Sequence, residues 1–341
     1  MSSFWIWAQF ILCLTVIVAA GSRLARYGDL LGEKTRLGRV WIGVVALAAI
    51  TSLPELATGV SSVTFVARPD LSLGDLFGSN LFNLLIIAVI DLYYRQGHVL
   101  LLLGTGIVLS AALGVMIIAA TASFIFLSQS GFTLVLFGRV GLFSLVLFSL
   151  YLFSQYMIYR YAPAEEGKKD GEMRPSQAIP PISRIIVFFL FAALATVGAG
   201  IWLAVLGSRI AEITGFSTTF VGTLFIAACT SAPEIVVSIS AVKIGALDMA
   251  IGNMVGSNLF NMGVVIFVDD LFYVPGPILQ GVQGVHILTA LFAILMCSII
   301  IISITFRPRF WLKSWIGIDT VAIAVIYLVA IISLYFLGNT S

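Results

Sequence analysis

Apolar residues run through almost the whole chain in blocks of about twenty, and short polar segments separate these blocks. A helix of about 20 apolar residues crosses the ~30 Å hydrocarbon core of a bilayer, so each block predicts one membrane-spanning helix. Ten such helices fit, near residues 4–22, 39–66, 71–90, 98–122, 132–158, 183–208, 216–241, 249–268, 280–305 and 314–337. The expected fold class is therefore an all-α integral membrane protein.

One segment that carries polar residues occurs twice within these apolar blocks. Residues 51–83 and 230–261 both begin with Thr-Ser-x-Pro-Glu and both end with Gly-Ser-Asn-Leu-Phe-Asn. Further along, we pair Asp91 with Asp269, because each lies eight residues beyond the last Asn of its copy. A repeat of this length indicates that one half of the chain is a copy of the other.

The repeat divides the chain into two five-helix halves, residues 1–160 and 183–341, joined by a hydrophilic linker over 161–182. The linker mixes both charges with Pro and Gly, as flexible connections do. Because five is odd, the second half enters the bilayer from the opposite face, which predicts inverted repeats. Pro54 and Pro233 lie inside apolar runs, so helices 2 and 7 are expected to break there.

Composition and charge agree with a membrane protein and set its orientation. The chain is 60% hydrophobic and 10% charged, and its net charge of +2 gives no support for a nucleic-acid partner. In the ten-helix topology, 15 of the 18 basic residues lie on one side, and the other three are Arg68, Arg139 and Arg209. Basic loops mark the cytoplasmic side. We therefore expect a cytoplasmic 161–182 loop and both termini outside. The sequence leaves the kind of membrane open, and a plasma membrane is the default expectation.

The repeated polar residues have the chemistry of a cation site. A Glu at mid-bilayer costs a few kcal/mol unless it faces a partner or water. Thr51, Ser52 and Glu55 share one helical face through their three- and four-residue spacing, and the second copy repeats the pattern. Carboxylate, hydroxyl and carbonyl oxygens suit hard cations such as Na⁺ and Ca²⁺.

The second part of each copy adds neutral oxygens and a stripe of glycines. Ser79 and Asn83 are four residues apart, as are their mates in the second copy, and we expect both beside Glu55. The glycines at 74 and 78, and those at 252 and 256, let another helix approach closely. The candidate cation ligands are therefore Glu55, Glu234, Thr51, Ser52, Ser79, Asn83, Thr230, Ser231, Ser257 and Asn261.

Three acidic residues are expected to serve helix ends. Asp70 and Asp248 precede the third and eighth helices, where an Asp commonly caps the helix N-terminus. Asp75 breaks the repeat, because its mate is Asn253. Two roles are open for it, a residue that lines the pathway near one face and an acid in the first turn of its helix, and the second is preferred.

The two motifs resemble the two alpha repeats of the cation/calcium exchanger superfamily, within its Na⁺/Ca²⁺ exchanger-like branch. The motifs that carry the resemblance are residues 51–55 with 78–83, and residues 230–234 with 256–261. The resemblance implies that Glu55 and Glu234 are the central Ca²⁺ ligands and that the other eight candidates complete the Na⁺ and Ca²⁺ sites. It also implies that backbone carbonyls near Ala48 and Ala227 help to bind Na⁺.

The expected function is secondary active antiport of Ca²⁺ against Na⁺ by alternating access. The alternatives are the same fold coupled to H⁺, another divalent cation as substrate, and a passive cation channel. We expect no enzyme activity, because neither a zinc-type His cluster nor a Ser–His pair is visible around the chain's two His residues. The transported ions and the lipid bilayer are the expected partners, no cofactor is expected, and a monomer is compatible with the sequence.

Overall fold

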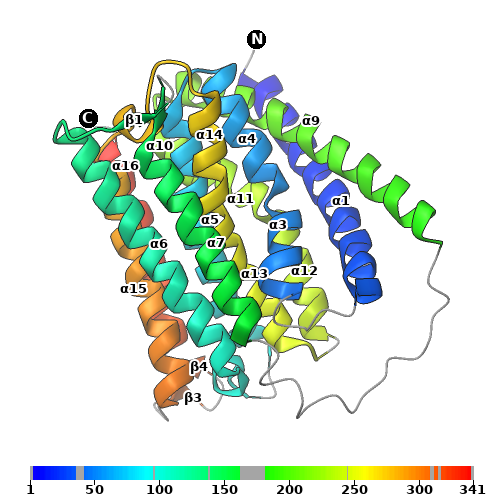
Figure 1. The fold of residues 1–341 in the computed structure, drawn as a ribbon. Coiled ribbons are helices and arrows are strands. Elements are labelled where there is room, and N and C mark those ends of the chain that lie inside the picture. The colour runs from blue at the N-terminus through cyan, green and yellow to red at the C-terminus, as the bar shows by residue number, and fades with distance from the viewer. Residues whose placement is uncertain are drawn as a thin grey trace.

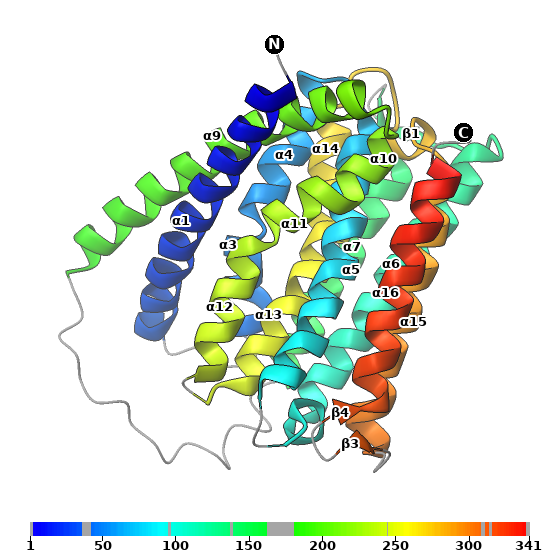
Figure 2. The same cartoon turned by 180° about the vertical axis from the view of Figure 1, so that it is seen from behind.

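The computed structural model describes residues 3–35, 42–94, 97–136, 139–161, 181–243, 245–307, 311–313 and 316–338. Figures 1 and 2 show a bundle of long helices, with α1 (Ser3–Thr35) and α9 (Ile182–Thr214) side by side along one flank. The structure is mostly helical, as predicted. Two short antiparallel strand pairs, β1 (Val135–Leu136) with β2 (Val140–Gly141) and β3 (Trp311–Lys313) with β4 (Ile316–Gly317), lie between helices.

The remaining helices follow in chain order. Between α1 and α9 lie the π-helical turn η1 (Ile42–Leu47), α3 (Ala48–Thr51), α4 (Leu53–Thr64), α5 (Pro69–Tyr93), the 3₁₀ turn η2 (Val99–Leu102), α6 (Thr105–Gln129) and α7 (Leu142–Tyr161). After α9 come α10 (Thr218–Val221), the π turn η3 (Gly222–Ile226), α11 (Ala227–Thr230), α12 (Ala232–Lys243), α13 (Leu247–Phe260), the π turn η4 (Asn261–Val265), α14 (Ile266–Phe272), the 3₁₀ turn η5 (Ile278–Gln280), α15 (Val285–Phe306) and α16 (Ile318–Gly338).

Both Pro-Glu motifs interrupt their helices at the serine two residues before the proline. Ser52 separates α3 from α4 with φ −86° and ψ 12°, and Ser231 separates α11 from α12 with φ −79° and ψ 5°. Proline has no N–H to donate, so it fits the first turn of the new helix, where an intrahelical partner is absent anyway. A π-helical turn lies directly before the short helix that leads to each break, η1 before α3 and η3 before α11.

The two copies of the motif run in opposite directions through the bundle. In Figure 1, α3 lies below α4, whereas α11 lies above α12, and Figure 2 shows the same order from behind. The N-terminal end of α1 and the C-terminal end of α16 lie at the same end of the bundle (Figure 1). The two Pro-Glu motifs are therefore antiparallel in space.

The glycine stripes pack each central helix against the other half of the chain. A Cβ placed on Gly78 of α5 would lie 2.3 Å from the carbonyl oxygen of Thr223 in η3. A Cβ on Gly256 of α13 would lie 2.1 Å from the carbonyl oxygen of Val44 in η1. Close helix approach at these glycines is thus confirmed. The approaching segment comes from the opposite half in both cases.

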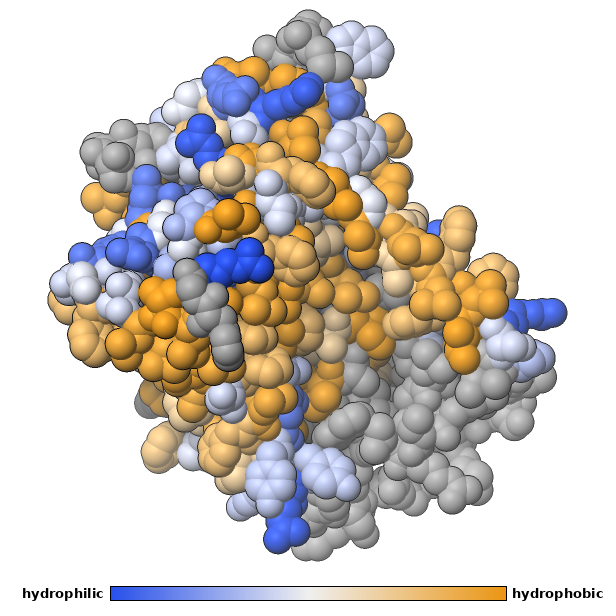
Figure 3. Space-filling view, turned by 45° about the horizontal axis from the view of Figure 1, so that its top comes forward, coloured by the Kyte–Doolittle hydropathy of each residue, from blue (hydrophilic) through white to orange (hydrophobic). Residues whose placement is uncertain are grey.

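Eight helical stretches in the described part of the chain are long and apolar enough to cross a membrane. They are residues 69–93, 105–129, 142–161, 183–214, 218–243, 247–272, 285–306 and 318–337. The apolar stretch of α1, Phe4–Ala20, is shorter, and the first interrupted segment, η1 to α4, is not among the eight. Figure 3 shows hydrophobic side chains over the flank of the molecule and hydrophilic ones gathered toward the end that bears the termini.

Asp70 and Asp248 do not cap their own helices, which begin after Arg68 and Ala246. Each instead accepts a hydrogen bond from a backbone N–H in a distant loop: Gln283 donates to Asp70 at 2.7 Å, and Gly104 donates to Asp248 at 3.1 Å. The loops lie just before α15 and α6, where helical N–H groups lack intrahelical acceptors. The expectation of N-caps is therefore wrong, because tertiary contacts use these carboxylates.

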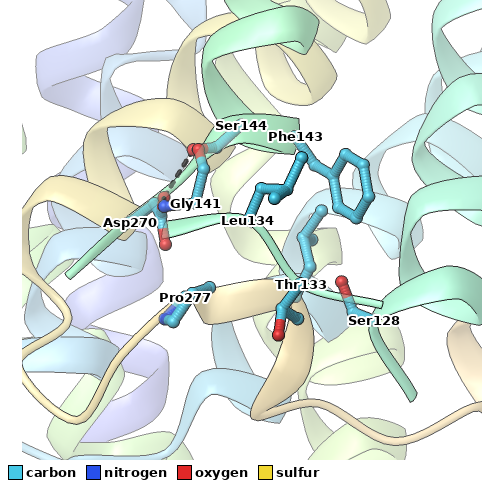
Figure 4. A pocket seen from close by; sticks show the side chains of 9 residues that line it. Ser128, Thr133, Leu134, Gly141, Phe143, Ser144, Asp270 and Pro277 are labelled. Atoms are coloured by element: carbon cyan, nitrogen blue, oxygen red, sulfur yellow. Dashed lines mark hydrogen bonds between the residues drawn. The ribbon is translucent and has the colours of Figure 1, made fainter. Parts of the chain in front are cut away.

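The contacts of Asp91 match those of Asp270, and the predicted pairing of Asp91 with Asp269 is wrong. Asp91 accepts from the N–H of Val99, eight residues on, and from the hydroxyl of Thr320, the third residue of α16. Asp270 also accepts from the N–H eight residues on. Its second donor is the hydroxyl of Ser144, the third residue of α7 (Figure 4). The π turn η4 adds one residue to the second copy and so shifts the register by one.

Asp269 then matches Ile90 and has no acidic counterpart in the first half. Its side chain is fully buried and accepts a hydrogen bond from Ser72 in the first turn of α5. It lies directly over Gly59 of α4, where an added Cβ would meet the carboxylate.

Candidate cation site

Two fully buried glutamates lie at the start of the interrupted helices, Glu55 on α4 and Glu234 on α12. Two serine hydroxyls donate to Oε1 of Glu55, Ser79 at 3.2 Å and Ser231 at 3.4 Å. Their counterparts donate to Oε1 of Glu234, Ser257 at 3.3 Å and Ser52 at 3.3 Å. Each glutamate thus accepts one hydrogen bond from its own half and one from the other half.

The second carboxylate oxygen of each glutamate has a different environment. Oε2 of Glu55 and Oε2 of Glu234 are buried and have no hydrogen-bond partner. Neither glutamate forms an ion pair with a Lys, Arg or His within the described ranges. A buried carboxylate oxygen without a partner is costly, so these two oxygens are available to a cation.

The two threonines of the motif extend the site on either side of the glutamates. Thr51 lies 3.3 Å from Oδ1 of Asn253 and 3.4 Å from Oγ of Ser257. Thr230 donates to Oδ1 of Asp75 at 2.9 Å and lies 3.3 Å from Oγ of Ser79. The two ends of the site pair equivalent residues, Thr51 with Asn253 and Thr230 with Asp75, and they differ because an aspartate occupies one end and an asparagine the other.

The preferred prediction, that Asp75 is an acid of the first helical turn, is wrong. Helix α5 begins at Pro69, so Asp75 lies in its second turn, where it is fully buried and faces Thr230. Neither Asp75 nor its mate Asn253 is among the ten candidate ligands, and a place on the pathway is only the second of the two roles considered for Asp75. One signal points to them: each lies four residues before a repeated serine, on the same helical face.

Asn83 and Asn261 contact the opposite central helix, and neither is hydrogen-bonded to a glutamate. Asn83 donates through Nδ2 to Oδ1 of Asn258 at 3.0 Å, and Asn261 donates to Oδ1 of Asn80 at 3.4 Å. The Oδ1 atoms of Asn83 and Asn261 are buried without a partner. The expected contact between Asn83 and Glu55 is not among the hydrogen bonds, and Asn80 and Asn258 instead join the two central helices through these cross-helix bonds.

The interrupted helices also place backbone oxygens beside the site. The carbonyl oxygen of Ala48 accepts from the N–H of Ser52 at 3.0 Å, and Thr51 lies 3.4 Å from it. The Ala227 carbonyl has the equivalent neighbours of the second copy, the N–H of Ser231 and the hydroxyl of Thr230. The site thus combines carboxylate, hydroxyl, amide and carbonyl oxygens, the ligand types that Na⁺ and Ca²⁺ prefer. No three His, Cys, Asp or Glu residues lie close enough to hold a metal by themselves in the described part of the chain.

The sequence profile of the sodium/calcium exchanger protein family matches residues 5–159 and 184–333. The two matched ranges cover most of the chain and contain all ten candidate ligands. The chain belongs to this family of cation/calcium antiporters and is an integral membrane protein.

Individual relatives agree with the family match. The sodium/calcium exchanger MaX1 of Methanosarcina acetivorans is 32% identical over 122 residues, which is 36% of this chain and 33% of that protein. The inner membrane protein YrbG of Escherichia coli is 26% identical over 275 residues, 80% of this chain and 81% of that protein. The putative antiporter CaxA of Alkalimonas amylolytica is 24% identical and covers 80% of this chain and 82% of that protein.

Solved structures share the fold over nearly the whole chain. The sodium-calcium exchanger NCX_Mj soaked with 2.5 mM Na⁺ and 0.1 mM Ca²⁺ superposes with a TM-score of 0.65 at 18% identity. The superposition covers 98% of this chain and 99% of that one. At this identity the likeness concerns the fold.

Proposed function

We propose that this protein exchanges Ca²⁺ for Na⁺ across a membrane by secondary active antiport. The ions would bind between Glu55 and Glu234, with Thr51, Ser52, Ser79, Asn83, Thr230, Ser231, Ser257 and Asn261 as neutral ligands. The observation that carries the proposal is the pair of buried glutamates, each with two serine donors and one unpartnered oxygen. Two ionised glutamates are neutralised by one Ca²⁺ or by two Na⁺, so the two ions compete for the same oxygens.

We further propose ten spans arranged as two inverted halves, residues 1–160 and 183–341, with 161–182 as the cytoplasmic linker. The antiparallel motifs and the matched acceptor sites of Asp91 and Asp270 support this arrangement. In such a molecule, rocking of one group of helices against the other exposes a central site to each side in turn. The helices α1 and α9, which lie together on one flank, are the candidates for the moving group.

Proton coupling is the second candidate, and one observation favours it. Glu55, Glu234 and Asp75 are all fully buried without a basic partner in the described structure, and such carboxylates can carry H⁺. In this version the same residues bind Ca²⁺ and release it when they are protonated. The two candidates share the substrate site and differ in the ion that drives transport.

Calcium uptake into proteoliposomes separates the two. We expect ⁴⁵Ca uptake driven by an imposed Na⁺ gradient at constant pH, and loss of that uptake in Glu55→Gln and Glu234→Gln. The matched control is Glu212→Gln, because Glu212 lies exposed on α9, and we expect this substitution to leave uptake unchanged. Uptake driven by a pH gradient without Na⁺ would establish the second candidate. Normal Na⁺-driven uptake by a folded Glu55→Gln variant would refute the assignment of the site.

A further inference from the structure

Asp269 on α14 is a fully buried acid that lies outside the glutamate site, and the proposed exchange assigns no role to it. Its Oδ2 accepts the hydroxyl of Ser72, whereas its Oδ1 is buried and has no hydrogen-bond partner. A Cβ on Gly59 would lie 2.8 Å from that Oδ1, so the glycine leaves the space that the carboxyl group fills. Burying such an acid costs free energy in either protonation state, because one of its oxygens lacks a partner.

Helix α4 carries one line of residues from the glutamate site to Asp269. Gly59 and Ser62 follow Glu55 at four and seven residues, so the three share one face of the helix. Asp269 lies over Gly59, and Ser62 is fully buried with a hydroxyl that has no hydrogen-bond partner. In Figure 1, α4 leads from α3 to the end of the bundle that bears the termini, where α14 also lies.

Helix α5 carries a second line between the same two places. Asp75 and Ser72 precede Ser79 by four and seven residues, so these three also share one helical face, and all are fully buried. Ser79 donates to Glu55 at 3.2 Å, and Ser72 donates to Asp269. Both lines therefore begin at one glutamate and end at one aspartate.

The equivalent lines in the second half end in apolar residues. Three buried polar residues near the termini have buried apolar mates: Ala241 for Ser62, Ala250 for Ser72 and Ile90 for Asp269. Ser238 takes the place of Gly59, and its hydroxyl donates to the carbonyl oxygen of Ala250 at 3.0 Å. The way out of the glutamate site is thus polar toward the termini and apolar toward the other end of the bundle.

An anchoring role for Asp269, in which it only fixes the start of α5, does not account for its open oxygen. The next residue, Asp270, shows what an anchoring acid looks like here. One of its oxygens accepts from Ile278, and the other accepts from Gly141 and Ser144 (Figure 4). Asp269 has a single donor, and the charged groups nearest to it in the described structure, Asp75 and Asp270, are acids as well.

We infer that Asp269, with Ser72 and Ser62, is a contact for the transported cation on the path between the glutamate site and the end that bears the termini. The path to the other end has no equivalent contact. This inference rests on the proposed function for its cation. While the path is dry, a proton keeps the carboxyl group neutral. When water enters, the ionised carboxylate attracts cations and speeds their passage to the glutamates.

The test compares two matched cysteine variants, Ser62→Cys and its repeat equivalent Ala241→Cys. A membrane-impermeant, positively charged methanethiosulfonate reagent is added to vesicles, and protease cleavage of an N-terminal tag shows which vesicles expose the termini. The natural protein, whose three cysteines are buried, gives the background labelling. We expect Ser62→Cys to be labelled from the side of the termini and to be protected by Ca²⁺. We expect no labelling of Ala241→Cys above background from either side.

The charge of Asp269 is tested in the same assay with an anionic reagent of similar size. Clefts lined by one sign of charge raise the entry rate of the opposite sign about tenfold or more. We therefore expect Asp269→Asn to lower the ratio of cationic to anionic labelling rates at Ser62→Cys about tenfold. The Ca²⁺ dissociation constant of purified Asp269→Asn in detergent should stay unchanged, which damage to the glutamate site would not allow. If Asp269→Asn does not fold, the comparison of Ser62→Cys with Ala241→Cys still decides.

The outcomes separate this inference from the proposed function, because labelling requires no transport. Equal labelling of the two cysteine variants, or an unchanged charge ratio in folded Asp269→Asn, would overturn the inference even if Na⁺-driven Ca²⁺ uptake is normal. Absent Na⁺-driven uptake with the expected labelling would overturn the exchange function and leave the cation path standing.

Discussion

The close contact at Gly78 predicts a large effect from the addition of one methyl group. In Gly78→Ala the new Cβ would lie 2.3 Å from the carbonyl oxygen and 2.6 Å from the Cα of Thr223. Non-bonded heavy atoms settle at about 3.5 Å, so α5 and η3 must separate by about 1 Å. Both crowded atoms of Thr223 are backbone, and they cannot rotate away as a side chain would.

The separation also displaces part of the cation site, because Ser79 is the next residue of α5. Its hydroxyl is 3.2 Å from Glu55 and 3.3 Å from Thr230, and a displacement of about 1 Å takes both distances past the hydrogen-bonding range. Overpacking of this kind costs about 1–3 kcal/mol. We expect a clear fall in the midpoint of thermal unfolding in detergent, together with weaker binding of Ca²⁺.

Gly114→Ala is the matched control. Gly114 lies within α6, and a Cβ placed there has no atom within 4 Å. We expect this variant to unfold at the same temperature as the natural protein or higher, since Ala is favoured over Gly inside a helix by about 0.5–1 kcal/mol. If Gly78→Ala matches Gly114→Ala in both unfolding temperature and Ca²⁺ affinity, close packing between the halves does not hold the site.

Two further variants test contacts outside the glutamates. Gly200→Ala on α9 places a Cβ 2.6 Å from the Cβ of Ala57, so we expect slower Ca²⁺ exchange in vesicles. The control is Gly198→Ala, whose added Cβ has no atom within 4 Å. Equal exchange rates in the two variants would contradict a moving α9. Ser144→Ala removes a donor to Asp270, which should lower unfolding stability by about 1–3 kcal/mol while Ca²⁺ affinity stays the same. A changed ion affinity with unchanged stability would place Asp270 in the transport path instead.

The repeated polar residues predict only part of the contacts at the centre of the site, because the expected contact of Asn83 with Glu55 is replaced by one with Asn258. Glu55 meets Ser79 as expected, because the spacing fixes both residues on facing helical surfaces. The preferred first-turn role of Asp75 is wrong, since its contacts depend on Thr230, 155 residues away, and on the helix starting at Pro69. Motif spacing within one copy carries no information about contacts between the copies.

Register was the other source of error. The pairing of Asp91 with Asp269 assumed that both copies advance by the same number of residues per turn. The π turn η4 breaks that assumption, and Asp270 occupies the matching place. The sequence over 261–265 contains no proline or charged residue that would signal such a turn.

The crossed serine donors also bear on how the chain is made. Ser231 completes the environment of Glu55, yet it is translated 176 residues later. During synthesis the first half must therefore enter the bilayer with its glutamate lacking one hydroxyl donor, at a cost of about 1–3 kcal/mol if the group is already dehydrated. Protonation of Glu55, or delayed burial of its helix, would avoid this cost until the second half is inserted.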